Sequence, residues 1–207
     1  MSMSVLVIIL IGLLFSITIH EAVHAFTSHY LGDDTAYQSG RLTLNPLAHI
    51  DPFATILLPL MLVQLGLPPF AAAKPVPFNP ARVRFGEFGA AIVGISGPVS
   101  NLLIAVFLGL WGRWFIGFDT GSVSDVFEIL VRLNLALFVF NMIPYPPLDG
   151  SRLLYAVAPD SLRRLMAMAE GVGLLGLAVF ILIFFPLFSA TVVNLVNWLF
   201  AVITSIS

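Results

Sequence analysis

Long apolar runs separated by short polar stretches dominate the pattern of this chain. The first run covers residues 3–31 and stops at the polar residues 32–34, and two further long runs cover residues 88–111 and 123–143. A helix needs about 20 apolar residues to cross a bilayer, and each of these runs reaches that length. The pattern therefore predicts an all-α, polytopic membrane protein.

Two other apolar runs leave their course through the membrane open. Residues 52–67 form a short run interrupted by Pro59, which fits a re-entrant or interfacial piece as well as a full crossing. Residues 171–207 would be about 55 Å long as one helix, which exceeds one ordinary crossing. We expect Pro186 to divide this run, and its second part, residues 187–205, either spans the membrane or lies in its interface.

The connecting stretches are polar or rich in proline. The alternating residues Arg41–Leu44 predict a short β-strand in the first loop, and the proline-dense residues 68–85 are expected to be extended rather than helical. The sequence shows no internal repeat and no second soluble domain, so we interpret residues 1–207 as a single membrane-embedded domain.

Composition supports this interpretation and narrows the possible partners. The chain is 59% hydrophobic and 10% charged, whereas soluble domains carry about 25% charged residues. A net charge of −2 without a basic block gives no reason to expect a nucleic-acid partner. Cysteine is absent, which excludes disulfides and thiolate metal sites. The first residues, MSMS, lack the basic start of a secretory signal, so we expect the first segment to be retained.

Two histidines and a glutamate lie inside the first apolar run, in the sequence HEAVH, His20 to His24. On a helix, positions i and i+4 lie one turn apart on one face, so both imidazoles can bind one Zn²⁺ while Glu21 reaches a water on the metal. A chance match to this short pattern is the alternative. A carboxylate without a cationic partner is costly in a bilayer, however, which favours the zinc interpretation.

The third zinc ligand is not close in sequence. The extended motif of some soluble enzymes fails, because Thr27 and Tyr30 stand where it needs Gly and His. His29 points away from the face of the histidine pair and is interpreted as an interfacial polar residue. His49, in a turn-rich loop, is interpreted as a structural hydrogen-bonding residue.

Asp149, in NMIPYPPLDG, is the better candidate for this ligand. Three prolines just before it make a continuous helix improbable, and a broken helix at membrane depth is tolerated where it lines a cavity. The alternative is that the preceding helix simply ends at Pro144 and that Asp149 is a solvated turn residue. From the residues alone, both interpretations stay open.

The pairing of HEAVH in a first membrane helix with NMIPYPPLDG after a later one resembles the site-2 protease family of intramembrane zinc metalloproteases. GPVSN, residues 97–101, looks like the Gly-Pro-Asn motif on that family's middle core helix. GRLTLNPLAHIDPF and AKPVPFNP look like the compact prokaryotic members, which carry no PDZ or CBS domain. The resemblance covers most of the chain.

The resemblance implies a three-helix catalytic core with extra transmembrane or re-entrant segments. It implies one Zn²⁺ per chain with three ligands, His20, His24 and Asp149, and it makes Glu21 the catalytic base. Asn141 would line the cavity and help to orient the substrate or the oxyanion, with Asn101 as its neighbour in that role. The implied activity is hydrolysis of peptide bonds within or next to transmembrane segments of membrane-protein substrates, in a prokaryotic cell membrane.

Lysine and arginine placement predicts the orientation. If residues 52–67 are re-entrant, all loop cations except Arg113 share one side of the membrane, whereas a full crossing would move Arg41 to the side of Arg113. The re-entrant arrangement also makes segments 3–31 and 123–143 parallel, as the family's core requires. We therefore expect the N-terminus outside and the zinc nearer the cytosolic face.

The main alternative is a catalytically inactive, metal-binding membrane regulator or transporter. The presence of Glu21 argues against it, because zinc binding needs the histidines and the aspartate but not a base. A transporter would also be expected to show inverted repeats or several ionisable residues along a path, and the sequence shows neither.

Overall fold

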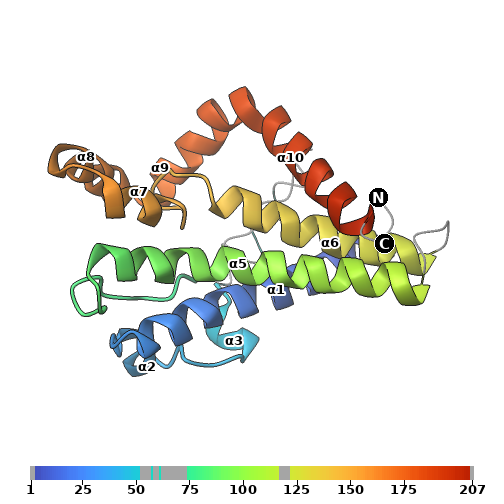
Figure 1. Ribbon diagram of the computed structural model, residues 1–207, viewed down its shortest axis with the longest axis horizontal. Helices are drawn as coiled ribbons and strands as arrows, with labels where there is room; N and C mark the ends of the chain where they lie inside the picture. Colours follow the sequence, from blue (N-terminus) through green and yellow to red (C-terminus); the bar gives the residue numbers. More distant parts are fainter. Residues whose placement is uncertain (1–2, 52–56, 58–60, 62–73, 117–121, 206–207) are drawn as a thin grey trace.

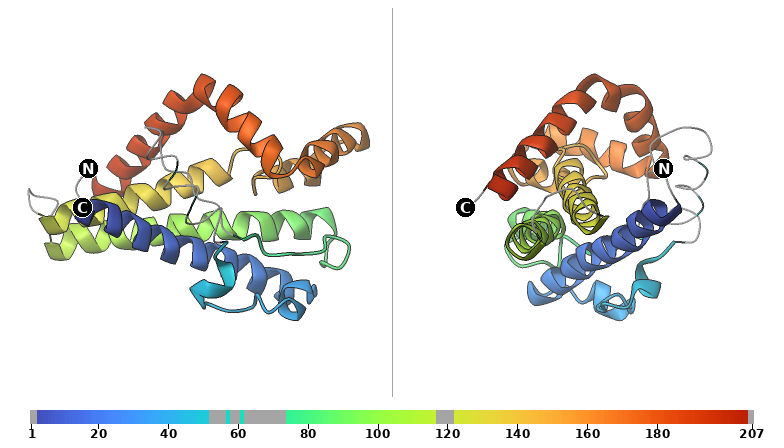
Figure 2. Two further views of the ribbon diagram at one scale, coloured as in Figure 1. Left: turned by 180° about the vertical axis from the view of Figure 1, so that it is seen from behind. Right: turned by 90° about the vertical axis from the view of Figure 1, so that its right-hand side faces the viewer.

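The computed structural model describes residues 3–51, 57, 61, 74–116 and 122–205. Three helices form its core: α1 (Met3–Tyr30), α5 (Glu87–Trp111) and α6 (Ser122–Asn141). They pack against one another, with α1 and α6 running in the same direction and α5 antiparallel to both (Figures 1 and 2). This is the arrangement that the re-entrant interpretation requires, although residues 52–67 themselves lie outside the described part of the chain except for Leu57 and Met61.

Three helical stretches in the described ranges are long and apolar enough to cross a membrane, Val7–Tyr30, Glu87–Phe115 and Phe180–Ser205. The second of these extends α5 through a π-helical turn, η2 (Gly112–Ile116). The predicted segment 123–143 is confirmed as a helix, α6, but it carries Asp125 as well as the ion pair Glu128–Arg132, whose Oε1 and Nε atoms are 2.7 Å apart. These charged residues distinguish α6 from the three stretches that are apolar enough to cross a membrane.

The C-terminal apolar run forms one bent helix rather than two separate ones. It consists of α9 (Leu174–Val179), a π-helical segment η3 (Phe180–Phe184) and α10 (Phe185–Ser205). Figure 1 shows the helix rising away from the core and then turning back across it. Pro186 is the second residue of α10 and follows η3, so a proline without an N–H and a π-helical turn both interrupt the regular hydrogen bonds of this helix. Ile203 of α10 packs on the buried side chains Ala105, Val131 and Leu135.

Two short helices, α2 (Thr35–Gln38) and α3 (Pro46–His49), follow α1. The predicted strand over Arg41–Leu44 is wrong, and no strand occurs in the described residues. The backbone turns instead, because Arg41 N–H donates to the Ala36 carbonyl and Thr43 N–H to the Arg41 carbonyl. Alternation of apolar and polar residues predicts a strand only where a partner strand lies alongside, and this loop has none in the described part.

Beyond Asp149 the chain forms α7 (Ser151–Val157) and α8 (Asp160–Gly171). Both helices lie at the end of the bundle where α1 ends and α5 begins (Figure 1). Tyr155, Ala158 and Met166 form a small core between them. Arg152 pairs with Glu170 and so ties the start of α7 to the end of α8.

Asp33, just after α1, ties this helix to the extended segment that precedes α5. Its buried carboxylate accepts hydrogen bonds from Thr35 N–H (3.1 Å) and Asn79 N–H (2.6 Å). Burial raises the pKa of Asp33, but the hydrogen bonds from Thr35 and Asn79 and the charge of Arg82 outweigh burial and hold the pKa below its usual value. The ionised form is therefore the one that the folded loop prefers.

Replacing Asp33 by asparagine is expected to lower the free energy of unfolding at pH 7 by about 1.5–3 kcal/mol, because charge-assisted hydrogen bonds are lost. A folded-state pKa below the unfolded value of about 3.9 stabilises the protein above that pH, and the gain is lost as the pH falls through the folded-state pKa. The difference in thermal midpoint between wild type and Asp33→Asn should thus shrink in acid. Asp34→Asn is the control, since Asp34 is exposed and pairs only with His29 among the contacts described. An equal loss of unfolding free energy in both variants would contradict the stabilising role of the Asp33 carboxylate.

Candidate metal centre

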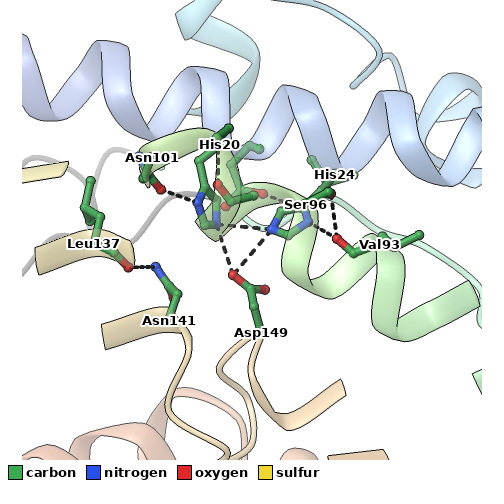
Figure 3. Close-up of polar contacts among 12 residues, drawn as sticks. His20, His24, Val93, Ser96, Asn101, Leu137, Asn141 and Asp149 are labelled. Atoms are coloured by element: carbon green, nitrogen blue, oxygen red, sulfur yellow. Dashed lines mark hydrogen bonds and ion pairs between the residues drawn. The ribbon is translucent and has the colours of Figure 1, made fainter. Parts of the chain in front are cut away.

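The two histidines of HEAVH lie one turn apart on α1 and face α5 (Figure 3). His20 is 7% exposed and His24 is 8% exposed, so both imidazoles are enclosed by the helices around them. Their rings are nearly perpendicular, with centroids 4.7 Å apart. The i, i+4 spacing in the sequence thus places both side chains on one face, as predicted.

Asp149 reaches the histidines from the turn that follows α6. The Gly150 N–H donates to the Asn141 carbonyl (2.7 Å), which closes the proline-rich stretch into a compact turn. A Cβ atom on Gly150 would lie 2.3 Å from the Met142 carbonyl oxygen, so a side chain at this position would open the turn. The turn folds back towards α5 and presents the Asp149 carboxylate to α1, which favours the ligand interpretation over a solvated turn residue.

The three side chains have the donor set and spacing of a metal site. His20 Nε2 lies 3.1 Å from His24 Nε2 and 3.1 Å from Asp149 Oδ2, and His24 Nε2 lies 3.4 Å from the same oxygen. Around a tetrahedral zinc ion with bonds of about 2.0–2.1 Å, neighbouring ligand atoms are about 3.3 Å apart. These residues form the group of three potential metal ligands found in the described part of the chain. Catalytic zinc sites take three protein ligands and keep the fourth position for water.

The second nitrogen of each imidazole is occupied by a hydrogen bond away from the site. His24 Nδ1 lies 2.7 Å from the Val93 carbonyl oxygen, and His20 Nδ1 lies 2.7 Å from Asn101 Oδ1. A carbonyl oxygen only accepts, so each Nδ1 carries the proton and each neutral Nε2 presents a lone pair to the centre. Metal-binding histidines use such partners to fix the tautomer and the ring orientation.

Gly97 of α5 keeps the space beside the ligand atoms free. A Cβ atom built on Gly97 would lie 2.3 Å from His24 Nε2 and 2.8 Å from His20 Nε2. A side chain at this position would therefore fill the place where an ion would sit. The sequence analysis connected Gly97 with a family motif on this helix, and its place beside the ligand atoms was not predicted.

Glu21 contacts the extended segment that precedes α5. The Val76 N–H donates to Glu21 Oε2, with a distance of 3.0 Å. The flanking residues of this segment, Pro75 and Pro77, have no N–H to offer. The carboxylate of Glu21 is therefore held at one oxygen, beside the ligand His20 in the sequence.

Comparisons with known proteins identify relatives of this chain. The family model described as peptidase family M50 matches residues 117–185, which include Asp149. A Bacillus subtilis protein named "Putative zinc metalloprotease YwhC" is 37% identical over 189 residues, covering 88% of this chain and 82% of that protein. The chain belongs to peptidase family M50. It is also 31% identical to "Putative zinc metalloprotease Rip2" of Mycolicibacterium smegmatis over 199 residues, 95% of this chain and 74% of that protein. No solved structure matches the chain.

Membership of family M50 confirms the resemblance to the site-2 proteases. This M50 peptidase is a zinc metalloprotease and an integral, multi-pass membrane protein. The family implies zinc, and the donor set fits it, because two imidazoles and one carboxylate with an open fourth position are typical of catalytic zinc.

The other predicted residues of the M50 chain lie at different distances from this centre. Asn141 donates to the Leu137 carbonyl of its own helix (3.0 Å) and lies on the same side as Asp149 in Figure 3. Asn101 has no exposed surface, and its Oδ1 atom contacts His20 Nδ1. His29 pairs with Asp34 at the surface, and buried His49 bonds the Thr43 carbonyl. Neither belongs to the group of His20, His24 and Asp149 found in the described residues.

Proposed function

We propose that this M50 peptidase hydrolyses peptide bonds within or next to transmembrane segments of membrane proteins and binds one zinc ion per chain. The observation that supports this proposal is the position of the ligands: His20 and His24 lie in the apolar stretch Val7–Tyr30, which is long enough to cross the membrane. A peptide bond brought to these ligands would have to enter the membrane-embedded part of the protein.

In the proposed mechanism His20, His24 and Asp149 hold the ion, and Glu21 moves the proton. Bound zinc supplies Lewis acidity, which lowers the pKa of a water molecule towards about 7 and polarises a carbonyl oxygen. Because Glu21 Oε2 accepts the Val76 N–H, we assign Oε1 to the proton of the attacking water. The same carboxyl group gives this proton to the leaving amine, so that Glu21 ends the cycle ionised.

Asn141 is proposed to contact the substrate. It is the last residue of α6, just before the turn that carries Asp149, and it is half-buried. The hydrogen bond described for its side chain goes to the Leu137 carbonyl of its own helix, a local bond that a substrate carbonyl could replace. An amide at this place can donate to a peptide carbonyl, which would orient the scissile bond.

The experiment that tests this function uses the full chain in proteoliposomes. A panel of single-span membrane proteins, tagged at both ends, is incubated with the zinc-loaded protein, and the products are identified by mass spectrometry. We expect cuts within or next to the apolar segment, which stop on removal of zinc by a chelator and return on its replacement. Zinc-independent cuts, or cuts confined to water-exposed tails, would contradict the proposal. Tight zinc binding without any cleavage would favour an inactive metal-binding regulator or transporter.

A further inference from the structure

We infer that Asn134 of α6 is a positioning residue of the metal centre, although it contacts none of the three ligands. Together with Asn101 it forms a hydrogen-bond relay, His20–Asn101–Asn134, that fixes the proton of His20 on Nδ1 and directs Nε2 at the ion. The inference rests on the proposed role of His20 as a ligand and does not depend on where the enzyme cuts its substrate.

The relay crosses all three core helices in two short steps. His20 Nδ1 of α1 lies 2.7 Å from Asn101 Oδ1 of α5. Asn101 Nδ2 lies 3.1 Å from Asn134 Oδ1 of α6, and a second, longer contact of 3.4 Å runs to the Ser16 carbonyl oxygen of α1. The orientation of a side chain on α1 therefore depends on an amide group that α6 supplies.

The bond between Asn134 and the Leu130 carbonyl determines which group donates and which accepts at every step of the relay. Asn134 is bound to the Leu130 carbonyl oxygen at 2.9 Å, and because that oxygen only accepts, the Asn134 group facing it is the NH₂. Asn134 Oδ1 then faces Asn101, which must present its own NH₂ there. This leaves Asn101 Oδ1 for His20, so that the imidazole proton is held on Nδ1. The Ser16 carbonyl, also an acceptor, demands the same orientation of Asn101.

Burial makes this direction hard to reverse. Asn101 is 0% exposed and Asn134 is 1% exposed, so water cannot replace either partner. A flipped Asn134 would place its oxygen against the Leu130 oxygen and leave two buried groups without a hydrogen-bond partner, which is costly where water cannot reach. The neighbours of Asn134 on α6, Val131 and Leu135, are 0% exposed and apolar. A polar residue in this apolar core is costly, and its role as an acceptor for Asn101 accounts for its presence.

The test measures zinc affinity of the full chain in detergent by competition with a chromogenic chelator, for Asn101→Ala, Asn134→Ala and the double variant. Residues that hold a metal-binding histidine typically contribute about 10–100-fold to metal affinity. We expect Asn101→Ala to weaken zinc by about that factor and Asn134→Ala by roughly tenfold. Because both act through one relay, Asn134→Ala should add less than about twofold in the Asn101→Ala background.

Two further variants separate the relay from packing. Asn134→Asp keeps the acceptor for Asn101 and should bind zinc more tightly than Asn134→Leu, which has a similar size and no polar group. The visible spectrum of the Co²⁺-loaded protein, which reports ligand geometry, should change in Asn134→Leu and return towards wild type in Asn134→Asp. Asn194→Ala, on an exposed position of α10, is the control and should leave zinc affinity unchanged.

Additive effects of the two alanine variants would overturn the relay, and so would unchanged zinc affinity in Asn134→Ala. An Asn134→Asp variant that binds zinc no better than Asn134→Leu would do the same. These outcomes leave the proposed function intact, because wild type still binds zinc in each of them. A wild-type protein that binds no zinc would instead overturn the proposed function and the relay together.

Discussion

Replacing Gly97 by alanine is expected to abolish zinc binding while the protein remains folded. The added methyl group would lie 2.3 Å from His24 Nε2 and 2.8 Å from His20 Nε2, inside the space that the ion needs. Both contacts are with the ends of side chains, so the imidazoles can rotate away without displacing the helices. Alanine also favours a helix over glycine by about 1 kcal/mol, which offsets part of the strain. The ligands are thus displaced, and the fold is kept.

The measurement for Gly97→Ala is the zinc content of the purified full chain, together with its helical circular dichroism. Wild type should contain about one zinc ion per chain and Gly97→Ala close to none, with the same helical signal. Gly171→Ala is a matched control, because a Cβ atom on this glycine of α8 would meet nothing within 4 Å. Full zinc content in Gly97→Ala would show that the ion does not occupy the space in front of this residue.

The sequence alone predicts a residue of the metal centre where its side-chain type and its spacing to other residues are typical of a metal ligand. His20 and His24 follow from the helical period, since four residues bring two side chains to one face. Asp149 was open from the residues alone and became a firm candidate only through the resemblance of NMIPYPPLDG to a family motif. The structure brings it within 3.1 Å of His20, across 129 positions of sequence.

The missed residues act through properties that a single sequence does not display. Gly97 matters because a side chain is absent there, and Val76 because its backbone N–H meets Glu21. Asn134 is a single amide side chain among apolar neighbours, and its hydrogen-bond partner Asn101 lies on another helix. Each of these roles depends on which segments the fold brings together. A polar residue between the apolar Val131 and Leu135 on the buried face of α6 was the signal that could have identified Asn134.

The fold was predicted best in segments where the length of an apolar run is enough to predict a helix. The expected first segment, residues 3–31, and the observed α1 differ by one residue at the C-terminal end. The strand expected over Arg41–Leu44 failed because alternation is a weak signal in a loop whose backbone bonds are local turns. Pro186 was expected to divide the last run, but the helix continues across it, because η3 leads directly into α10.

Replacing Glu21 by glutamine is expected to lower kcat/KM for cleavage by about 10²–10⁴-fold while zinc affinity stays within about twofold of wild type. Glutamine has the same shape, and its amide oxygen can still accept the Val76 N–H, so the extended segment and the side chain keep their places. What is lost is the group that takes the proton from water, because a neutral amide is not a base near pH 7. A defect in catalysis without a defect in zinc binding is therefore expected.

The measurement combines zinc content with the rate of cleavage of a tagged single-span membrane protein in proteoliposomes. Glu87→Gln provides the matched control, because it removes one carboxylate from the first turn of α5 without touching the residues assigned to the mechanism. It should cleave at close to the wild-type rate. Robust cleavage by Glu21→Gln would exclude Glu21 as the base. If Glu21→Gln lost zinc along with activity, this carboxylate would have to act in holding the ion, and another group would have to move the proton.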